Sequence, residues 1–257
     1  MSTPGRPKGE SLRPQAEGTP VRLLEVQAVS KRFGGLTANQ DVSFSLERGQ
    51  IVGLIGPNGA GKTTLFNCVA GFFAPTAGTV TLDGQAITGL PPEACARAGV
   101  GRTFQIARTF TSMTACENVL SGALLRDRHV GRAREAAMHW LAFVNLDRFA
   151  DKPSRSMTVS EQRRLAVARA MATSPKLLLM DEVMAGLNPS EVRETVDVVL
   201  KIRDKGISCL IVEHVLEGIM PIADKIVVLD RGSKIAEGTP AEVSNDPAVI
   251  HAYLGDE

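Results

Sequence analysis

The sequence predicts an α/β fold, in which helices cover a buried, mainly parallel sheet, accompanied by a small antiparallel β layer and an inserted helical subdomain. The run "IVGLI" is continuously apolar and a glycine-rich turn follows it directly, which is typical of a strand buried on both faces. From Lys176 onward, apolar strand-like runs alternate with helical stretches. Between these regions, at about residues 107–173, apolar residues recur at three-to-four spacing, as in amphipathic helices.

The N-terminal part of the chain predicts a tail followed by the β layer. Pro, Gly and polar residues dominate the first 20 positions and cannot bury enough apolar area to offset the entropy of ordering. We therefore expect a disordered tail at residues 1–20 and one folded domain at residues 21–257. The segments "RLLEVQAV" and "DVSFSLE" predict half-buried antiparallel strands, and "TVTLDGQAI" predicts a β-hairpin that turns at Asp83 and Gly84.

Helices and strands follow one another through the rest of the chain. Three segments with helical periodicity are expected to form the subdomain, namely "ACENVLSGALL", "GRAREAAMHWLAFV" and "SEQRRLAVARAMAT". After them come strand "LLLMD", helix "PSEVRETVDVVLKIRDKG", strand "ISCLIVE", helix "VLEGIM" and strand "KIVVLD". This order predicts an α/β sheet into which a helical lobe is inserted.

The composition excludes several classes of protein. The 29 basic and 28 acidic residues nearly cancel, so the overall charge does not favour nucleic-acid binding. No apolar run reaches the roughly 18 residues that a bilayer crossing needs, and the first 20 residues lack the apolar core of a signal peptide. The four cysteines are far apart and form no C-x-x-C pair, which argues against zinc or a disulfide framework. We expect a cytoplasmic protein without a nucleic-acid partner.

The segment "GPNGAGKTT" matches the phosphate-binding P-loop pattern and lies between a predicted strand and a predicted helix, as that pattern requires. Its glycines let backbone N–H groups surround the phosphates, Lys62 supplies positive charge and the Thr63 hydroxyl binds Mg²⁺. A plain glycine turn is the alternative, but a chance match in this context is rare. The sequence therefore predicts a site for a nucleoside triphosphate and Mg²⁺. The predicted nucleotide contacts are Gly56, Pro57, Asn58, Gly59, Ala60, Gly61, Lys62, Thr63 and Thr64.

An acidic pair follows the apolar residues of "LLLMDE". In a P-loop protein, Asp181 would hold the Mg²⁺ shell and Glu182 would orient or deprotonate the attacking water. A helix cap is the ordinary alternative for such a pair. Because the P-loop is present, we expect both carboxylates to serve phosphoryl transfer together with Lys62.

The order of these motifs resembles the ATP-binding subunits of ABC transporters, over nearly all of the chain after the tail. The resemblance implies a P-loop NTPase of the ABC ATPase type with a RecA-like core, ATP as its nucleotide and a D-loop at residues 185–189, "AGLNP". It also implies that Phe33 in "VSKRFGG" stacks on adenine, and that His214 in "IVEHV" lies near the γ phosphate. Gln105 in "GRTFQ" would contact Mg²⁺ and couple to the membrane subunit. Taken singly, Phe33 also fits a core aromatic residue, His214 a helix cap and Gln105 a polar residue at the end of a strand.

Three longer segments narrow the resemblance to the ATPases of branched-chain amino-acid uptake: "RFGGLTANQDVSFSLERGQIVGLIGPNGAGKTTLFN", "GRTFQIARTFTSMTACENV" and "AEGTPAEVSNDPAVIHAYLG". This class implies an importer subunit on the inner face of the cell membrane, two integral membrane permease subunits and, indirectly, an extracytoplasmic substrate-binding protein. The cargo stays open, because related importers carry urea, short amides or other amino acids. A lipopolysaccharide exporter ATPase and a soluble ABC ATPase of DNA repair or translation are further alternatives. Glu182 argues against a subunit that binds ATP without hydrolysing it.

The signature loop departs from the family pattern. Where ABC ATPases usually read LSGGQ, residues 157–161 read "MTVSE". In the family, two subunits pack head to tail, and this loop contacts the γ phosphate of the nucleotide that the other subunit binds. Thr158 would replace the serine hydroxyl, Val159 and Ser160 add side chains at the approach point, and Glu161 is expected to bring an anion close to an anion.

These departures predict an unequal pair of subunits. The chain keeps its own catalytic residues, so its nucleotide can be hydrolysed against a partner's normal signature loop. The partner's nucleotide, which would face "MTVSE", is expected to turn over more slowly. We therefore expect pairing with a different ATPase subunit. Val183 and Asn188, which replace proline and aspartate of many relatives, imply no loss of activity.

Overall fold

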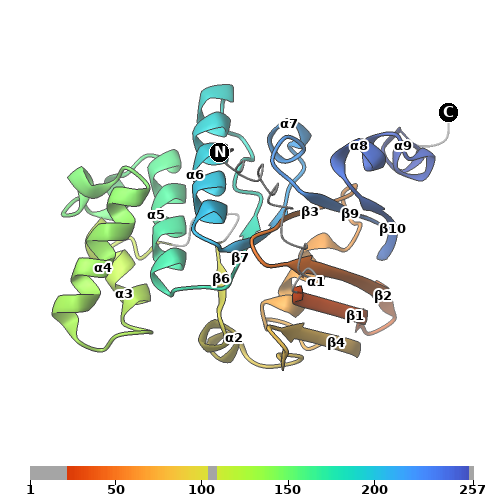
Figure 1. Cartoon of the computed structure of the whole chain (residues 1–257), viewed down its shortest axis with the longest axis horizontal. Coiled ribbons are helices and arrows are strands. Elements are labelled where there is room, and N and C mark those ends of the chain that lie inside the picture. Colours follow the sequence, from red (N-terminus) through yellow and green to blue (C-terminus); the bar gives the residue numbers. More distant parts are fainter. Residues whose placement is uncertain (1–21, 104–108, 255–257) are drawn as a thin grey trace, which may run out of the picture.

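The computed structural model describes residues 22–103 and 109–254, which form two sheets with helices packed around them (Figure 1). The smaller sheet has the strand order β2-β1-β4-β5 and is antiparallel. Val26 of β1 lies opposite Phe44 of β2 and Val80 of β4, so one face of this sheet is apolar, as the alternation predicts. Its strands are β1 (Arg22–Phe33), β2 (Leu36–Glu47), β4 (Ala77–Leu82) and β5 (Gln85–Ala86).

The larger sheet has six strands in the order β10-β9-β3-β8-β7-β6. All neighbouring strands are parallel except β10, which runs antiparallel to β9. Every residue of β3, β7 and β8 is buried, which confirms the strands predicted from continuous apolar runs. The strands are β3 (Ile51–Ile55), β6 (Val100–Arg102), β7 (Leu177–Asp181), β8 (Ser208–Val212), β9 (Lys225–Asp230) and β10 (Ser233–Gly238).

The helices form separate groups around the large sheet. Figure 1 shows α3, α4 and α5 grouped at the left, and α8 and α9 at the right. Leu65 and Phe66 of α1 share one apolar core with residues of both sheets, whereas a second core joins the large sheet to α3, α4, α5 and α6. The helices are α1 (Lys62–Val69), α2 (Pro92–Ala98), α3 (Ala115–Ala123), α4 (Val130–Phe143), α5 (Val159–Ala172), α6 (Pro189–Asp204), α7 (Leu216–Ile219), α8 (Pro240–Ser244) and α9 (Pro247–Leu254).

Most predicted elements occur with small shifts at their ends. The helix predicted at residues 189–206, for example, ends at Asp204. Several short elements, among them α2, β6, β10, α8 and α9, were not predicted, because none of them has a long periodic pattern. The predicted tail at residues 1–20 and the beginning of the predicted helical stretch, residues 107 and 108, lie outside the described residues.

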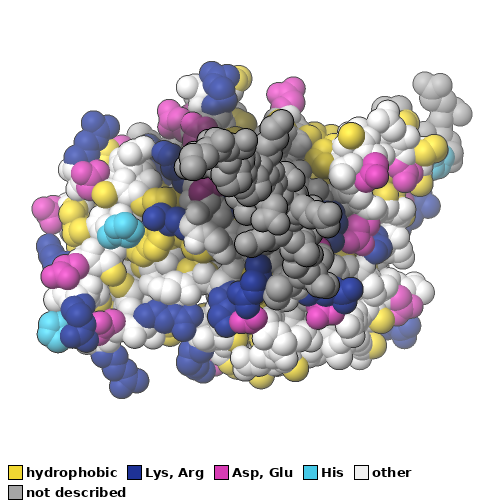
Figure 2. All heavy atoms as spheres, viewed as in Figure 1, with side chains coloured by type: hydrophobic (Ala, Val, Ile, Leu, Met, Phe, Trp, Pro, Cys, Tyr) yellow, Lys and Arg dark blue, Asp and Glu magenta, His cyan; other side chains and the backbone are white. Residues whose placement is uncertain are grey.

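Charged side chains are mixed on the surface. Figure 2 shows Lys and Arg interspersed with Asp and Glu over the visible face, apart from the area covered by residues that are not described. Within residues 22–103 and 109–254, none of the helices combines the length and the apolar composition that a bilayer crossing needs. The four cysteines are buried, and burial raises the pKa of Cys68 to about 11 and that of Cys209 to about 12.

Candidate nucleotide-binding site

The glycine-rich loop connects the buried strand β3 to the N-terminus of α1, as predicted. Its glycines have left-handed backbone angles, with φ of 146° at Gly56, 81° at Gly59 and 94° at Gly61. A Cβ on Gly56 would lie 2.0 Å from the carbonyl oxygen of Leu229, and one on Gly61 would lie 2.4 Å from that of Ala38. Both positions therefore need glycine for conformation and for space.

Lys62 begins α1, and its ammonium points back over the loop. Nζ donates to the backbone carbonyls of Gly56 at 2.7 Å and Pro57 at 2.9 Å. Burial lowers the pKa of Lys62, and the nearby carboxylates of Glu182 and Asp181 oppose this shift. The loop therefore holds a cation beside a helix N-terminus, and the two together favour an anion such as phosphate.

The loop lines a cavity of about 500 Å³. The turn between β9 and β10 reaches the loop through Gly232, whose N–H donates to Ala60 O at 3.1 Å. Strand β2 reaches it through Asn39, whose Nδ2 donates to Gly61 O at 3.2 Å. The lining residues are Leu36, Thr37, Ala38, Asn58, Gly59, Ala60, Gly61, Lys62, Thr63, Thr64, Glu182, Arg231 and Gly232.

The acidic pair lies where β7 ends, beside this cavity. Asp181 is buried, and burial raises the pKa of its carboxyl, while Arg102 opposes that shift. Glu182 takes a left-handed φ of 49°, and its N–H donates to Val212 O at 2.9 Å. His214 follows β8, with Nδ1 3.7 Å from Glu182 Oε1. The fold thus brings Lys62, Glu182 and His214 to one edge of the sheet.

Phe33 and Gln105 are placed differently. Phe33 ends β1, where its ring packs edge-on against Phe73 with 5.2 Å between centroids, and the residue is 41% exposed. It does not belong to the described lining of the phosphate-side cavity, so adenine stacking by Phe33 stays a prediction. Gln105 lies outside the described residues, and its predicted roles stay predictions as well.

The signature segment lies at the N-terminus of α5. Thr158 is the N-cap: its hydroxyl accepts from the N–H of Glu161 at 3.2 Å, and Glu161 Oε2 accepts from the N–H of Thr158 at 2.8 Å. Lys152 Nζ is 3.2 Å from the same carboxylate oxygen. Burial acts to raise the pKa of Glu161, but the Thr158 N–H and Lys152 lower it overall.

These contacts show what partners the Glu161 carboxylate has within this chain, whereas its closeness to a partner's phosphate stays a prediction. Its carboxylate is turned back onto the helix cap and paired with Lys152. The side chain that projects outward is Val159, which is 66% exposed. Ser160 is half-buried beside it, so steric bulk is the remaining difference from a glycine loop.

Four residues near the site were missed by sequence reasoning. Asn39 and Gly232 hold neighbouring elements against the loop, and only the fold brings them there. Arg102, within the segment "GRTFQ", has its Nη2 3.5 Å from Asp181 Oδ2. Glu213, beside the predicted His214, is fully buried and accepts from the N–H of Met184 at 2.8 Å. A charged residue at the end of an apolar strand was the available signal for the last two.

The donor set fits a nucleotide with its magnesium ion. In the described part of the chain, no group of three or more His, Cys, Asp and Glu side chains could hold a metal by itself. The site offers the Thr63 hydroxyl and the buried Asp181 carboxylate instead. Mg²⁺ is commonly held by one or two protein oxygens together with water and substrate phosphates. The glycine loop supplies the phosphate side of this arrangement.

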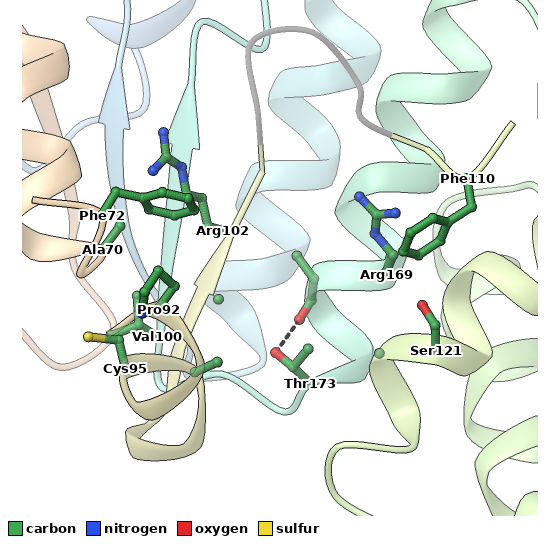
Figure 3. Close-up of a pocket in the computed structure, with 14 residues that line it drawn as sticks. Ala70, Phe72, Pro92, Cys95, Val100, Arg102, Phe110, Ser121, Arg169 and Thr173 are labelled. Atoms are coloured by element: carbon green, nitrogen blue, oxygen red, sulfur yellow. Dashed lines mark hydrogen bonds between the residues drawn. The ribbon is translucent and has the colours of Figure 1, made fainter. Parts of the chain in front are cut away.

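A second cavity, of about 440 Å³, lies between the large sheet and α3 and α5. Figure 3 shows Phe72 and Arg102 side by side on one side of it and Phe110 and Arg169 on the other. Described residues on both flanks of the segment 104–108, Arg102 and Phe110, line this cavity. The remaining lining residues are Ala70, Pro92, Cys95, Ala96, Val100, Gly101, Ser121, Gly122, Ala170 and Thr173.

Two family models match the chain. The model "ABC transporter" matches residues 39–185, which contain the glycine loop and the acidic pair, and the model "Branched-chain amino acid ATP-binding cassette transporter" matches residues 233–257. This chain belongs to the ABC transporter ATP-binding family. The fold and the resemblance predicted from its motifs are thereby confirmed.

Similarity to individual ABC proteins extends along almost the whole chain. BraF of Pseudomonas aeruginosa, a high-affinity branched-chain amino acid transport ATP-binding protein, is 43% identical over 253 residues, which cover 91% of this chain and 98% of BraF. LivG of Escherichia coli, with the same description, is 41% identical over 250 residues, at the same coverage. The lipopolysaccharide export ATP-binding protein LptB of E. coli is 34% identical over 238 residues, covering 92% of this chain and 99% of LptB.

The solved structures agree with the family assignment. The ADP conformation of MJ1267, an ATP-binding cassette of an ABC transporter, superposes with a TM-score of 0.84 at 30% identity, covering 92% of this chain and 100% of MJ1267. A nucleotide-free ATP-binding cassette from an ABC transporter superposes with the same TM-score and identity. The α/β ABC ATPase fold therefore applies to this cassette, and the family is one of ATPases coupled to transport.

Proposed function

We propose that this ABC cassette is the ATP-hydrolysing, energy-coupling subunit of an importer for branched-chain amino acids. The observation that carries the proposal is the match of residues 233–257 to the branched-chain amino acid cassette model, a segment outside the ATPase motifs. The higher identity to BraF and LivG than to LptB supports the same choice. The alternatives that remain are an importer of urea or amides, an exporter ATPase and a soluble ABC ATPase.

The residues at the cavity suggest how ATP would be hydrolysed. The loop N–H groups and Lys62 would bind the phosphates, and Thr63 and Asp181 would hold Mg²⁺, with Gln105 as a further predicted ligand. Bound Mg²⁺ neutralises charge on the phosphate oxygens. Glu182 would orient the attacking water or accept its proton. His214, with Nδ1 3.7 Å from Glu182 Oε1, would lie beside that carboxylate and near the γ phosphate.

A second ATPase subunit would complete the site. In a head-to-tail pair, Thr158 and Ser160 would face the nucleotide of the partner, and the partner's signature loop would face the cavity of this chain. Val159, which is 66% exposed, would lie at that face, where the usual loop has a glycine. We expect the partner's nucleotide to be held less closely there, so that the chain's own site carries most of the turnover.

The second cavity is suited to the permease. It is lined by residues from both flanks of the segment 104–108, where the predicted coupling residue Gln105 lies, and Phe72 and Phe110 offer exposed apolar surface. We propose that a cytoplasmic segment of one permease subunit occupies it, with the cassette on the inner face of the membrane. Cargo would be selected by the permease and by an extracytoplasmic binding protein.

Co-purification tests this assembly. A C-terminally tagged chain is isolated from membranes in mild detergent, and its partners are identified by mass spectrometry. The proposal predicts two polytopic membrane proteins and a second ATPase with an intact signature loop. Recovery of ribosomes, DNA or soluble partners alone would contradict it, and recovery of outer-membrane assembly proteins would favour the exporter alternative.

A further inference from the structure

Arg102 reaches the carboxylate at the end of the neighbouring strand. Strands β6 and β7 are parallel with Arg102 opposite Leu179, so Asp181, further along β7, lies on the same face of the sheet. Nη2 of Arg102 is 3.5 Å from Oδ2 of Asp181, and only 12% and 6% of these side chains are exposed. The pair is shielded from water, so its mutual attraction exceeds that of a surface pair.

A second contact connects Arg102 to the loop after α1. Its Nη1 donates to the side-chain oxygen of Asn67 at 2.7 Å. The backbone carbonyl of Asn67 accepts from the N–H groups of Phe72 at 2.9 Å and Phe73 at 3.2 Å. Asn67 therefore joins the guanidinium and the loop that carries Phe72 into one hydrogen-bonded unit.

The guanidinium also lies between two aromatic rings. Its central carbon is 4.9 Å from the ring centroid of Phe66 and 4.6 Å from that of Phe72, distances typical of cation–π contacts. Phe66 is fully buried, whereas Phe72 is 46% exposed and lines the second cavity with Arg102 (Figure 3). A group that enters this cavity and moves Phe72 therefore acts on the cation that holds Asp181.

We propose that Arg102 is a positioning residue that holds the Asp181 carboxylate back from the metal until the second cavity is occupied. A cation beside Asp181 competes with Mg²⁺ for the same oxygen atoms. When a segment docked in the cavity draws Phe72 away, Arg102 follows its stacking partner and Asp181 becomes available to the metal. This inference rests on the proposed function, since it takes Asp181 as a Mg²⁺ ligand and the permease as the occupant.

The opposite wall of the cavity provides a matched control. The guanidinium carbon of Arg169 on α5 lies 5.2 Å from the ring centroid of Phe110, so the same pair of residue types faces the cavity from the helical side. Phe110 lines the cavity as Phe72 does and is similarly exposed, so its replacement also alters the cavity wall. Since Phe110 does not stack on the arginine that is ion-paired to Asp181, its replacement should leave the metal affinity as it is.

The experiment measures metal binding and not turnover. The purified full chain is titrated with Mn²⁺ at saturating ADP, and free Mn²⁺ is read from its EPR signal. Relative to the wild-type chain, Arg102→Met should bind Mn²⁺ about tenfold more tightly, because a competing charge is removed, and Arg102→Lys should stay close to wild type. Phe72→Leu should shift the affinity in the same direction by a smaller factor, and Phe110→Leu should not shift it.

Distinct outcomes separate the failure of each claim. If the wild-type chain binds no Mn²⁺ with ADP, the proposed function fails at its first step. If the wild-type chain binds Mn²⁺ and ADP, two results would each overturn the role of Arg102. One is an unchanged or weaker Mn²⁺ affinity of Arg102→Met, and the other is a shift in Phe110→Leu as large as that in Phe72→Leu. ADP binding without metal is measured for each variant, because its loss identifies a misfolded variant. If Arg102→Met does not fold, the comparison of Phe72→Leu with Phe110→Leu serves as the test.

Discussion

His214 Nδ1 lies 3.7 Å from Glu182 Oε1, and this contact joins the turns that follow two neighbouring parallel strands. Asp181 pairs with Val212 in the register of β7 and β8, so the next residues along both strands emerge at the same edge of the sheet. The imidazole therefore lies beside the carboxylate that is proposed to act on water, at a distance slightly longer than a hydrogen bond. The relationship depends on strand register, because a slip of one strand by one residue would turn its side chain to the opposite face of the sheet.

Glu182→Gln should lower the rate of ATP hydrolysis by a factor of about 10² to 10⁴, because an amide cannot accept the proton of water. The affinity for ATP should remain, since the glycine loop and Lys62 are unchanged. Phosphate release and equilibrium ATP binding, measured on the same preparation, check both statements. Exposed Glu217→Gln is the control, and hydrolysis at the wild-type rate in Glu182→Gln would remove Glu182 from the reaction.

Gly61→Ala should destabilise the chain more than Gly84→Ala. Both glycines have positive φ, 94° and 76°, so both substitutions add strain of about 1 to 2 kcal/mol. Only the Cβ at position 61 would meet other atoms, at 2.4 Å from Ala38 O and 2.5 Å from Asn39 Nδ2, whereas the surroundings of Gly84 are open. Thermal melting compares the two, and equal losses in Tm would show that close approach at the loop contributes nothing.

Glu213→Gln should change how stability depends on pH. Burial raises the pKa of Glu213, although the N–H of Met184 opposes the shift. A carboxyl with a raised folded-state pKa contributes stability that is present below its unfolded pKa and is lost as pH rises through the folded value. Glutamine cannot ionise, so the free energy of unfolding of the Glu213→Gln variant, relative to that of the wild type, should increase from pH 5 to pH 8. The same difference in Tm between variant and wild type at pH 5 and pH 8 would contradict this. Glu217→Gln, at an exposed position, is the control.

Restoring glycines in the signature segment should increase turnover by the assembled pair. Val159→Gly with Ser160→Gly removes the side chains at the approach point and leaves the cap formed by Thr158 and Glu161 in place. ATPase activity of the co-purified complex should rise, and with it the share contributed by the partner's site. The control is a variant of the partner that cannot hydrolyse ATP: against that background the double glycine variant should give no increase.

Much of the candidate site was predictable, because its motifs are encoded in short, continuous segments of the sequence. A loop such as residues 56–64 carries its own backbone requirements, and "LLLMDE" places its carboxylates at a strand end in any parallel sheet. The continuous apolar runs fixed the buried strands for the same reason. The closeness of Glu182 and His214 follows once β7 and β8 are neighbours.

What the sequence did not show depends on contacts between distant segments. Asn39 and Gly61 are separated along the chain, and their hydrogen bond exists only because β2 crosses the loop. The environment of Arg102 needs α1, β6 and β7 together. The cap that Glu161 forms with Thr158 was overlooked, although a threonine followed three residues later by glutamate is a capping-box pattern.

Transport by the reconstituted complex tests the central claim most directly. The co-purified complex is placed in liposomes with its binding protein and supplied with ATP on the side of this cassette. The account predicts accumulation of labelled leucine, isoleucine or valine that requires ATP and is abolished by Glu182→Gln in this chain. ATP hydrolysis without uptake of any of these amino acids, or uptake that Glu182→Gln leaves unchanged, would contradict it.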